Sequence, residues 1–297
     1  MSAIIMDGKA LGNKIRENVK ERTTALKAKG IIPCLAVVLV GDDPASLSYV
    51  KSKEKALAEA GMESKDIRLP QETSERELLS IIEKLNKDEN IHGILVQSPV
   101  PKHINEQKVN DTVSPQKDVD CFHPVSVGNM VLERNGFLPC TPAGVLMLLR
   151  EYNISVSGAH VVIVGRSNIV GKPLANLLIR REYNATVTLC HTGTKDLKSH
   201  TLQADILIAA AGKPDLIKPD MIKEGAAVID VGINRVNDPS AQKGYRLCGD
   251  VDPAVVQKAG FFTPVPGGVG PMTIAMLLQN VADAAFATVA KKEEKNE

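Results

Sequence analysis

The chain has 297 residues, long enough for two domains, and its 43% hydrophobic and 24% charged content is that of an ordinary globular protein. Its 36 basic and 35 acidic residues leave a net charge of +1, which provides no global field to attract nucleic acid or an anionic membrane. With 3% aromatic residues and no tryptophan, the sequence also disfavours a base-stacking surface for single-stranded nucleic acid.

The cysteine and histidine patterns predict a protein without a metal site. The five cysteines stand singly, without CxxC spacing, which fits reduced thiols in a reducing compartment better than disulfides or zinc. The six histidines form no paired cluster. The N-terminal stretch MSAIIMDGKALGNK contains no signal-peptide core and no Arg-rich transit segment, and no apolar run approaches the roughly 20 residues of a membrane span. We therefore expect a cytoplasmic protein that does not enter a membrane.

Short β-branched runs alternate with helical patterns along the first half. The runs at 34–41, 64–69 and 91–97 predict strands, and the periodicity at 44–61 and 74–88 predicts helices. Nearly continuous apolar strands interleaved with helices are typical of a parallel sheet covered on both faces.

The second half repeats this alternation and predicts a second α/β domain. Its strands are expected at 161–165, 185–190, 205–210, 226–232 and 261–264.

The domain boundary is expected in the irregular stretch 114–142, which carries four prolines. A helical pattern at 141–153 leads into the second half, and the apolar helix at 271–290 is expected to pack back on the first domain. The fold class is thus two α/β domains with a substrate cleft between them, the second Rossmann-like. We assign residues 1–140 with 271–297 to the first domain, and residues 141–270 to the second.

The segment HVVIVGRSNIVGKPLANLL predicts a nucleotide-binding turn between a strand and a helix. Gly165 ends the strand, and Gly171 with Pro173 opens the helix, although the G-x-G-x-x-G fingerprint is absent. Such a turn offers free backbone N–H groups and a helix dipole to a phosphate. The alternative is an ordinary loop between a strand and a helix.

The residues after the next strand favour NADP over NAD. An NAD site requires a carboxylate there for the ribose 2′-hydroxyl, but LCHTGTK contains none before Asp196. Thr192 and Lys195 stand in its place, and Arg166 lies on the first turn. The planar guanidinium of Arg166 offers several charged N–H donors to a 2′-phosphate. The alternative is that Arg166 and Lys195 are solvated loop charges.

Tyr49 and Lys53 are expected to share one face of a helix. Asp43 fits the N-cap and Pro44 the first turn, so Tyr49 and Lys53 lie four residues apart. A lysine whose pKa burial lowers can shuttle protons, although most helical lysines are solvated.

Three polar residues lie at the end of the next apolar strand or after it. Gln97 ends that strand, where substrates gather in open α/β sheets, and it would orient a substrate, bind the lysine or cap the strand. In an extended segment Asp118 and Asp120 point to the same side. Either carboxylate could bind a polar heterocycle or brace the turn.

The string TPVPGGVGPMT places three glycines and three prolines within residues 264–271, directly before a helix. This rigid, bare backbone suits close approach to a ligand, and a tight structural crossover is the alternative.

Six strings in this order and spacing carry a resemblance: YVKSK, ILVQSPVP, KDVDCFHP, VIVGRSNIVGKP, VIDVGIN and TPVPGGVGPMT. The chain resembles the methylenetetrahydrofolate dehydrogenase/methenyltetrahydrofolate cyclohydrolase family, the FolD-type bifunctional enzymes, over residues 4–285. The resemblance implies a homodimer that oxidises 5,10-methylenetetrahydrofolate with NADP and hydrolyses the methenyl product to 10-formyltetrahydrofolate.

The same resemblance implies roles for single residues. Lys53 matches the catalytic lysine, Tyr49 the residue that stacks on the folate ring, Gln97 the amide that positions the lysine, and Asp120, not Asp118, the pterin-anchoring acid. The cofactor contacts it implies are Gly165, Arg166, Ser167, Thr192 and Ile233. The loop that meets substrate and nicotinamide contains Pro264, Gly267 and Gly268.

Three residues depart from the family pattern beside the site. Ser98 and Val100 stand where leucines are common, and Cys121 replaces a common glycine, but none of them removes a group that the chemistry requires. The alternatives are a cyclohydrolase alone, an NADP-dependent small-acid dehydrogenase of the shikimate type, and a non-catalytic NADP-binding regulator. The retained GRSNIVGKP loop argues against a cyclohydrolase alone. The YVKSK and TPVPGGVGPMT strings argue against a small-acid dehydrogenase, and the retained Lys53, Gln97 and Asp120 argue against a regulator.

Overall fold

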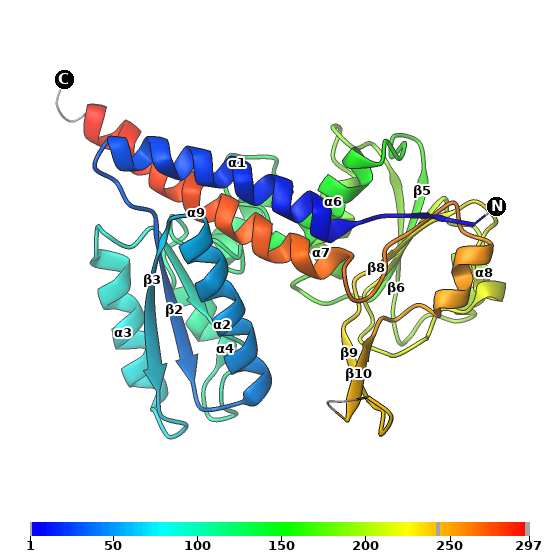
Figure 1. Ribbon diagram of the computed structural model, residues 1–297, viewed down its shortest axis with the longest axis horizontal. Helices are drawn as coiled ribbons and strands as arrows, with labels where there is room; N and C mark the ends of the chain where they lie inside the picture. The colour runs from blue at the N-terminus through cyan, green and yellow to red at the C-terminus, as the bar shows by residue number, and fades with distance from the viewer. Residues whose placement is uncertain (1, 242–243, 295–297) are drawn as a thin grey trace. The chain divides into compact units, whose positions relative to one another are not determined.

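The structure is a computed structural model that describes residues 2–241 and 244–294 (Figure 1). The chain divides into two compact units. The three-stranded unit comprises Asn13–Cys140 and the residues from Ile274 onward, and the six-stranded unit comprises Thr141–Thr273 and the N-terminal residues up to Gly12. Three helices contain the points at which the chain passes from one unit to the other: α1 (Gly8–Ala28), α6 (Cys140–Glu151) and α9 (Val269–Glu294).

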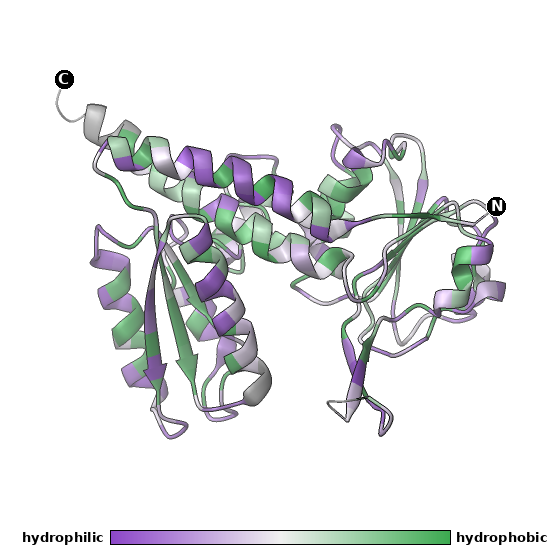
Figure 2. Cartoon of the chain, in the orientation of Figure 1, coloured by the Kyte–Doolittle hydropathy of each residue, from purple (hydrophilic) through white to green (hydrophobic). Residues whose placement is uncertain are grey.

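The three-stranded unit is built on a parallel sheet of order β3-β2-β4, formed by β3 (Glu63–Leu69), β2 (Cys34–Val40) and β4 (Gly93–Val96). The central strand β2 is buried along its whole length. The edge strand β3, ESKDIRL, is largely exposed, and Figure 2 shows it as hydrophilic beside the hydrophobic β2. The continuous apolar run of β2 therefore reflects cover on both faces.

The helices of this unit cover both faces of its sheet. In Figure 1, α2 (Pro44–Glu59) and α3 (Glu75–Lys87) lie on opposite faces of the sheet. As predicted, Asp43 caps α2: its carboxylate accepts a hydrogen bond from Ser46 N at 2.8 Å, and proline occupies the first turn. Two shorter helices are α4 (Glu106–Thr112) and α5 (Pro124–Val131). The predicted irregular stretch 114–142 therefore contains a helix, α5, which begins at a proline because proline fits the first turn.

The six-stranded unit has a parallel sheet of order β1-β11-β8-β7-β5-β6. Its strands are β1 (Ile4–Ile5), β5 (His160–Val164), β6 (Thr186–Cys190), β7 (Ile206–Ala209), β8 (Ala227–Asp230) and β11 (Phe261–Phe262). The connecting helices are α7 (Gly171–Leu178), α8 (Leu197–Thr201), η1 (Pro219–Met221) and η2 (Pro253–Gln257). Because β6 and β7 flank β5 on opposite sides, the strand order switches from one side of β5 to the other. Open α/β sheets bind ligands at the carboxyl end of such a switch point.

The N-terminal residues belong to the second sheet, which corrects the expected domain of residues 1–140. Ile4 and Ile5 of β1 pair with Phe261 and Phe262 of β11, and residues up to Gly12 fall in the six-stranded unit. A strand of two residues carries no periodicity, so its pairing depends on a partner more than 250 residues away.

A hairpin within the six-stranded unit was not predicted. It consists of the antiparallel strands β9 (Asn234–Asn237) and β10 (Tyr245–Cys248). The Arg235 guanidinium lies 3.7 Å from the centre of the Tyr245 ring, a cation–π contact across the pair. Strand β9 contains a single apolar residue, Val236, and β10 has only four residues, so their pattern did not predict a sheet.

The final helix α9 packs on the three-stranded unit, as predicted. Ala285 and Val289 join Leu26 and Ile31 in a buried cluster, and Asp283 forms an ion pair with Arg22. Contrary to the expectation from the sequence, its stretch Val269–Val289 is long and apolar enough to cross a membrane. Since 61% of that stretch is buried inside the structure, its composition is equally that of a core helix.

Candidate functional site

A lysine and an amide meet at the carboxyl edge of the three-stranded sheet. Lys53 Nζ donates a hydrogen bond of 3.1 Å to Gln97 Oε1. Lys53 extends from α2, the helix that follows β2. Gln97 directly follows β4, and its backbone N–H donates to Val38 O at 2.8 Å. The Gln97 side-chain N–H donates to Ser98 O at 2.7 Å, so the carboxamide is held at both ends. One helical turn before Lys53, the Tyr49 ring is about half exposed.

The structure separates the roles of the two aspartates. Asp118 is buried, and its carboxylate accepts hydrogen bonds from Phe122 N at 3.1 Å and His123 N at 2.8 Å, so it braces the turn. Burial raises the pKa of the Asp120 carboxyl, and the nearby Lys53 ammonium opposes that rise. Asp120 thus belongs to the same cluster as Lys53 and Gln97, whereas Asp118 supports the backbone that carries it.

Two residues that the sequence did not single out hold Asp120 in place. The Cys140 thiol donates to Asp120 Oδ1 at 3.5 Å and to Val119 O at 3.4 Å. Burial, and to a smaller extent the Asp120 charge, raise the pKa of the Cys140 thiol well above its usual value. Asn280 of α9 donates to Val119 O at 2.7 Å and to Leu138 O at 3.0 Å. An asparagine within an otherwise apolar helical stretch was the signal in the sequence that could have identified Asn280, because a buried amide requires hydrogen-bond partners.

The nucleotide-type turn lies in the six-stranded unit. Gly165 follows β5 with φ +128°, and Ser167 Oγ accepts hydrogen bonds from Val170 N at 3.1 Å and Gly171 N at 3.5 Å at the start of α7. A Cβ on Gly171 would lie 1.9 Å from Gly165 O. Glycine is therefore required at both ends of the turn, by backbone conformation at one and by close packing at the other.

Two exposed cations lie at the ends of neighbouring strands. Arg166 follows β5, and Lys195 follows β6 in the turn that contains Thr192. That turn is closed by hydrogen bonds from His191 N to Thr194 Oγ1 at 2.9 Å and from Gly193 N to His191 Nδ1 at 3.0 Å. Arg166, Lys195 and Thr192 are exposed, and no ion pair involves either cation in the part of the chain that the structure describes. Both positive charges are available to an anion.

Replacing Gly165 with alanine is expected to destabilise the six-stranded unit by about 3 kcal/mol or more. The new Cβ would lie 2.0 Å from Ala210 O, and φ +128° is a glycine conformation. Urea unfolding measures the loss. Gly158→Ala is the matched control, because Gly158 also has a positive φ, +77°, but has open space around it. Equal losses in the two variants would contradict the close packing at Gly165.

The proline–glycine loop borders a cavity of about 130 Å³. Pro264, Gly267 and Gly268 line it together with Ile233, which follows β8, and with Asp230, the last residue of β8. Gly267 has φ +110°, and Gly268 N donates to Pro264 O at 2.8 Å. The loop residues and Ile233, which were predicted at two separate places in the sequence, therefore line one cavity, and Asp230 adds a carboxyl that was not predicted.

The Asp230 carboxylate lies in a cradle of backbone N–H groups. It accepts hydrogen bonds from Gly232 N at 3.0 Å, Asp250 N at 2.9 Å and Val251 N at 2.9 Å. Burial raises its pKa to about 7, against the opposing effect of these three N–H groups. A Cβ on Gly249 would lie 1.8 Å from Asp230 Oδ2, so glycine is needed beside the carboxylate.

A second aspartate, Asp250, is fully buried beside it. Its Oδ2 accepts from Ala211 N at 2.6 Å and Gly212 N at 2.9 Å, and its Oδ1 accepts from Lys213 N at 2.9 Å and Asn234 Nδ2 at 2.8 Å. The two carboxylates thereby hold the turn after β7 and the segment after β8. We call them the Asp230–Asp250 pair.

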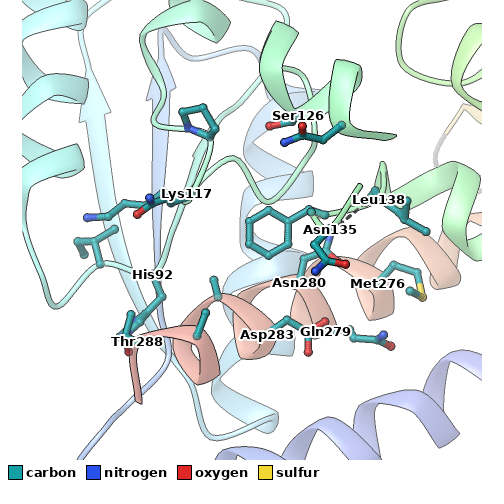
Figure 3. Close-up of a pocket in the computed structure, with 18 residues that line it drawn as sticks. His92, Lys117, Ser126, Asn135, Leu138, Met276, Gln279, Asn280, Asp283 and Thr288 are labelled. Atoms are coloured by element: carbon teal, nitrogen blue, oxygen red, sulfur yellow. Dashed lines mark hydrogen bonds between the residues drawn. The ribbon is translucent and has the colours of Figure 1, made fainter. Parts of the chain in front are cut away.

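The larger cavity, of about 620 Å³, lies elsewhere, in the three-stranded unit (Figure 3). Asn280 and Asp283 of α9 line it, together with His92 and Lys117 from other segments. Lys117 Nζ donates to Leu85 O at 2.9 Å and Asp88 O at 2.7 Å, so its ammonium is occupied by the end of α3. None of the predicted site residues lines this cavity. Within residues 2–241 and 244–294, no group of three His, Cys, Asp or Glu residues could hold a metal ion.

Two family models match the chain. The model described as the tetrahydrofolate dehydrogenase/cyclohydrolase catalytic domain matches residues 6–120. The model described as the NAD(P)-binding domain of the same family matches residues 139–289. Together they span most of the sequence, and each match falls mainly on one of the two units.

Whole proteins of known name match over nearly the full length. The chain is 56% identical to the bifunctional protein FolD of Moorella thermoacetica over 286 residues, which are 96% of this chain and 99% of that one. The crystal structure of the bifunctional FolD methylenetetrahydrofolate dehydrogenase/cyclohydrolase of Campylobacter jejuni is 50% identical, with a TM-score of 0.92, over 97% of this chain and 100% of that one.

A third similar protein was solved with a bound cofactor. The Trypanosoma brucei methylenetetrahydrofolate dehydrogenase-cyclohydrolase, complexed with NADP and an inhibitor, is 39% identical with a TM-score of 0.93, over 97% of this chain and 99% of that one. Identity above 50% across almost the entire length, with both family models matched, is decisive. The chain belongs to the tetrahydrofolate dehydrogenase/cyclohydrolase family.

Proposed function

We propose that this chain is a bifunctional folate enzyme that oxidises 5,10-methylenetetrahydrofolate with NADP and then hydrolyses 5,10-methenyltetrahydrofolate to 10-formyltetrahydrofolate. The observation that carries the proposal is the hydrogen bond between Lys53 and Gln97, which joins a proton-carrying group to an orienting amide at the carboxyl edge of a sheet. The near full-length similarity to bifunctional FolD proteins supports both activities. The NADP complex of the T. brucei relative supports the choice of cofactor.

The three-stranded unit is proposed to bind the folate. Lys53 is the catalytic lysine, and Gln97 positions its ammonium group through the 3.1 Å hydrogen bond. Tyr49, half exposed one turn before Lys53, offers its ring to the folate ring system. Asp120 anchors the pterin: a carboxyl whose pKa burial has raised can hydrogen-bond the N–H groups of a heterocycle.

The six-stranded unit is proposed to bind NADP. Gly165, Arg166 and Ser167 form the turn after β5, where the amino end of the α7 dipole meets a phosphate. Arg166, with Thr192 after β6, contacts the 2′-phosphate. Ile233 and the Pro264–Gly268 loop border the nicotinamide, on the cavity that they share.

The chemistry needs only what these residues supply. NADP, when bound, would supply the acceptor for a hydride from the methylene carbon, and the protein contributes mainly the orientation of the two partners. In the hydrolysis, water oxygen bonds to the methenyl carbon, one carbon–nitrogen bond of the ring breaks, and the released nitrogen takes up a proton. The Lys53 amine accepts one proton from the water and returns it to that nitrogen, and the second water proton leaves to solvent as the formyl C=O forms. Gln97 Oε1 keeps Lys53 Nζ in place through its hydrogen bond.

We also propose that the chain works as a homodimer in the cytoplasm. The strand β6 ends the six-stranded sheet and leaves one edge available to a second copy. All five cysteines are free thiols, which fits a reducing compartment. Sedimentation at about twice 31.9 kDa is the expected result, and a monomer at micromolar concentration would contradict it.

The function is tested by absorbance of the protein mixed with 5,10-methylenetetrahydrofolate and either NADP or NAD. We expect NADPH to form faster than NADH, and the methenyl intermediate to decay faster than by uncatalysed hydrolysis. Fast decay of added methenyl substrate without any reduced cofactor would instead indicate a cyclohydrolase alone. Inactivity in both assays would contradict the folate assignment and favour a small-acid dehydrogenase.

A further inference from the structure

The Asp230–Asp250 pair places buried negative charge at the edge of the proposed nicotinamide site. Both aspartates are buried, with side-chain exposures that leave almost nothing to solvent, and Asp230 lines the cavity that Ile233 and Gly267 share. Among the described residues, the hydrogen-bond partners of the two carboxylates are six backbone N–H groups and the Asn234 amide. These dipoles stabilise the carboxylates without cancelling their net charge.

The two redox states of the cofactor differ in charge at the nicotinamide ring. The oxidised ring carries one positive charge and the reduced ring none, whereas the phosphates are the same in both. A fixed negative charge close to the ring therefore stabilises the oxidised form selectively, and a site of low dielectric constant strengthens the effect. If the pair only held the loop in shape, its removal would change the affinities for the oxidised and the reduced cofactor equally.

We propose that the Asp230–Asp250 pair makes this protein bind NADP⁺ in preference to NADPH, and so favours uptake of the oxidised cofactor and release of the reduced one. The inference rests on the proposed function, because it assumes that the nicotinamide lies beside Ile233 and the Pro264–Gly268 loop. The pair acts through its electric field, at a distance from the transferred hydride, and it binds no ligand of its own. The packing of the two carboxylates also explains the glycines at positions 232 and 249. A Cβ on Gly232 would lie 2.3 Å from Asp250 Oδ1, and a Cβ on Gly249 would lie 1.8 Å from Asp230 Oδ2.

The test compares the dissociation constants of NADP⁺ and NADPH, each measured by calorimetry without folate. In Asp230→Asn at pH 8, the ratio of the NADPH constant to the NADP⁺ constant is expected to fall about threefold to tenfold, as the loss of one unit charge roughly 10 Å away gives at an effective dielectric constant of about 25 to 50. Asp205→Asn is the matched control, because it removes one carboxylate in the same unit but before β7, at the amino edge of the sheet. Its ratio should stay at the wild-type value.

Asp230→Asn also loses hydrogen bonds, so a second measurement uses the unaltered protein. Because the pKa of Asp230 is raised to about 7, its charge is lost as the pH falls from 8 to 6, and the ratio is expected to fall with it. The titratable side chains that act on it are Asp250 and, from β10, Cys248, while β7 and β11 contain only apolar residues. The ionisation of the 2′-phosphate is common to both cofactor forms and cancels in the ratio.

The outcomes separate the inference from the proposed function. Equal weakening of NADP⁺ and NADPH in Asp230→Asn, or a ratio that does not change between pH 8 and 6, would overturn the charge preference and leave NADP as the cofactor. If Asp230→Asn does not fold, the pH series on the unaltered protein decides alone. Failure of the unaltered protein to bind either form would overturn the proposed cofactor, and this inference with it.

Discussion

Replacing Lys53 with methionine is expected to lower the cyclohydrolase rate by at least about 100-fold while NADP binding stays unchanged. Methionine keeps the length of the side chain but removes the ammonium that donates to Gln97 Oε1, so no proton can be exchanged with the reacting water. The cofactor turn lies in the other unit, on residues that Lys53 does not support. Hydrolysis of methenyltetrahydrofolate and calorimetric titration with NADP measure the two effects separately.

Lys51→Met is the matched control for this experiment. Lys51 lies on the same helix, two residues earlier, and its side chain is exposed. The control should retain both activities and the same unfolding midpoint as the unaltered chain. A Lys53→Met variant that hydrolyses the methenyl substrate at the original rate would show that another group moves the proton.

Replacing Arg166 with glutamine is expected to raise the KM for NADP about 10- to 100-fold and to leave the KM for NAD nearly unchanged. Charge-assisted hydrogen bonds are each worth about 1.5–3 kcal/mol, and only NADP carries the 2′-phosphate that would receive them. Arg166 is exposed after β5 and has no ion pair among the described residues, so its loss should not disturb the fold.

Initial rates with each cofactor at saturating folate measure the effect, and Arg181→Gln, an exposed arginine after α7, is the control. Equal increases of the KM for NADP and NAD would place Arg166 on a phosphate that the two cofactors share. No change for either would make Arg166 a solvated loop charge and would leave the 2′-phosphate to Thr192 and Lys195.

The sequence by itself determined the local elements of both units. The buried strand β2 was recognisable because seven consecutive apolar residues fit a strand covered on both faces. The start of α2 was recognisable because Asp43 and proline have intrinsic preferences at the N-cap and first turn. Lys53 was placed one turn after Tyr49 for the same reason: helical spacing is a property of the local chain. These features depend on neighbours within a few residues.

Only the tertiary structure decided which distant residues meet. The hydrogen bond from Lys53 to Gln97 joins residues 44 apart, and that from Asn280 to Val119 joins residues 161 apart. Asp230 and Asp250 were ordinary aspartates in the sequence, and the backbone N–H groups that cradle them come from three separate segments. Strand β1 lies in the six-stranded sheet because of a pairing that two isoleucines cannot encode. Local pattern specifies secondary structure, but burial and polar contact depend on how the elements pack, which no short stretch of sequence contains.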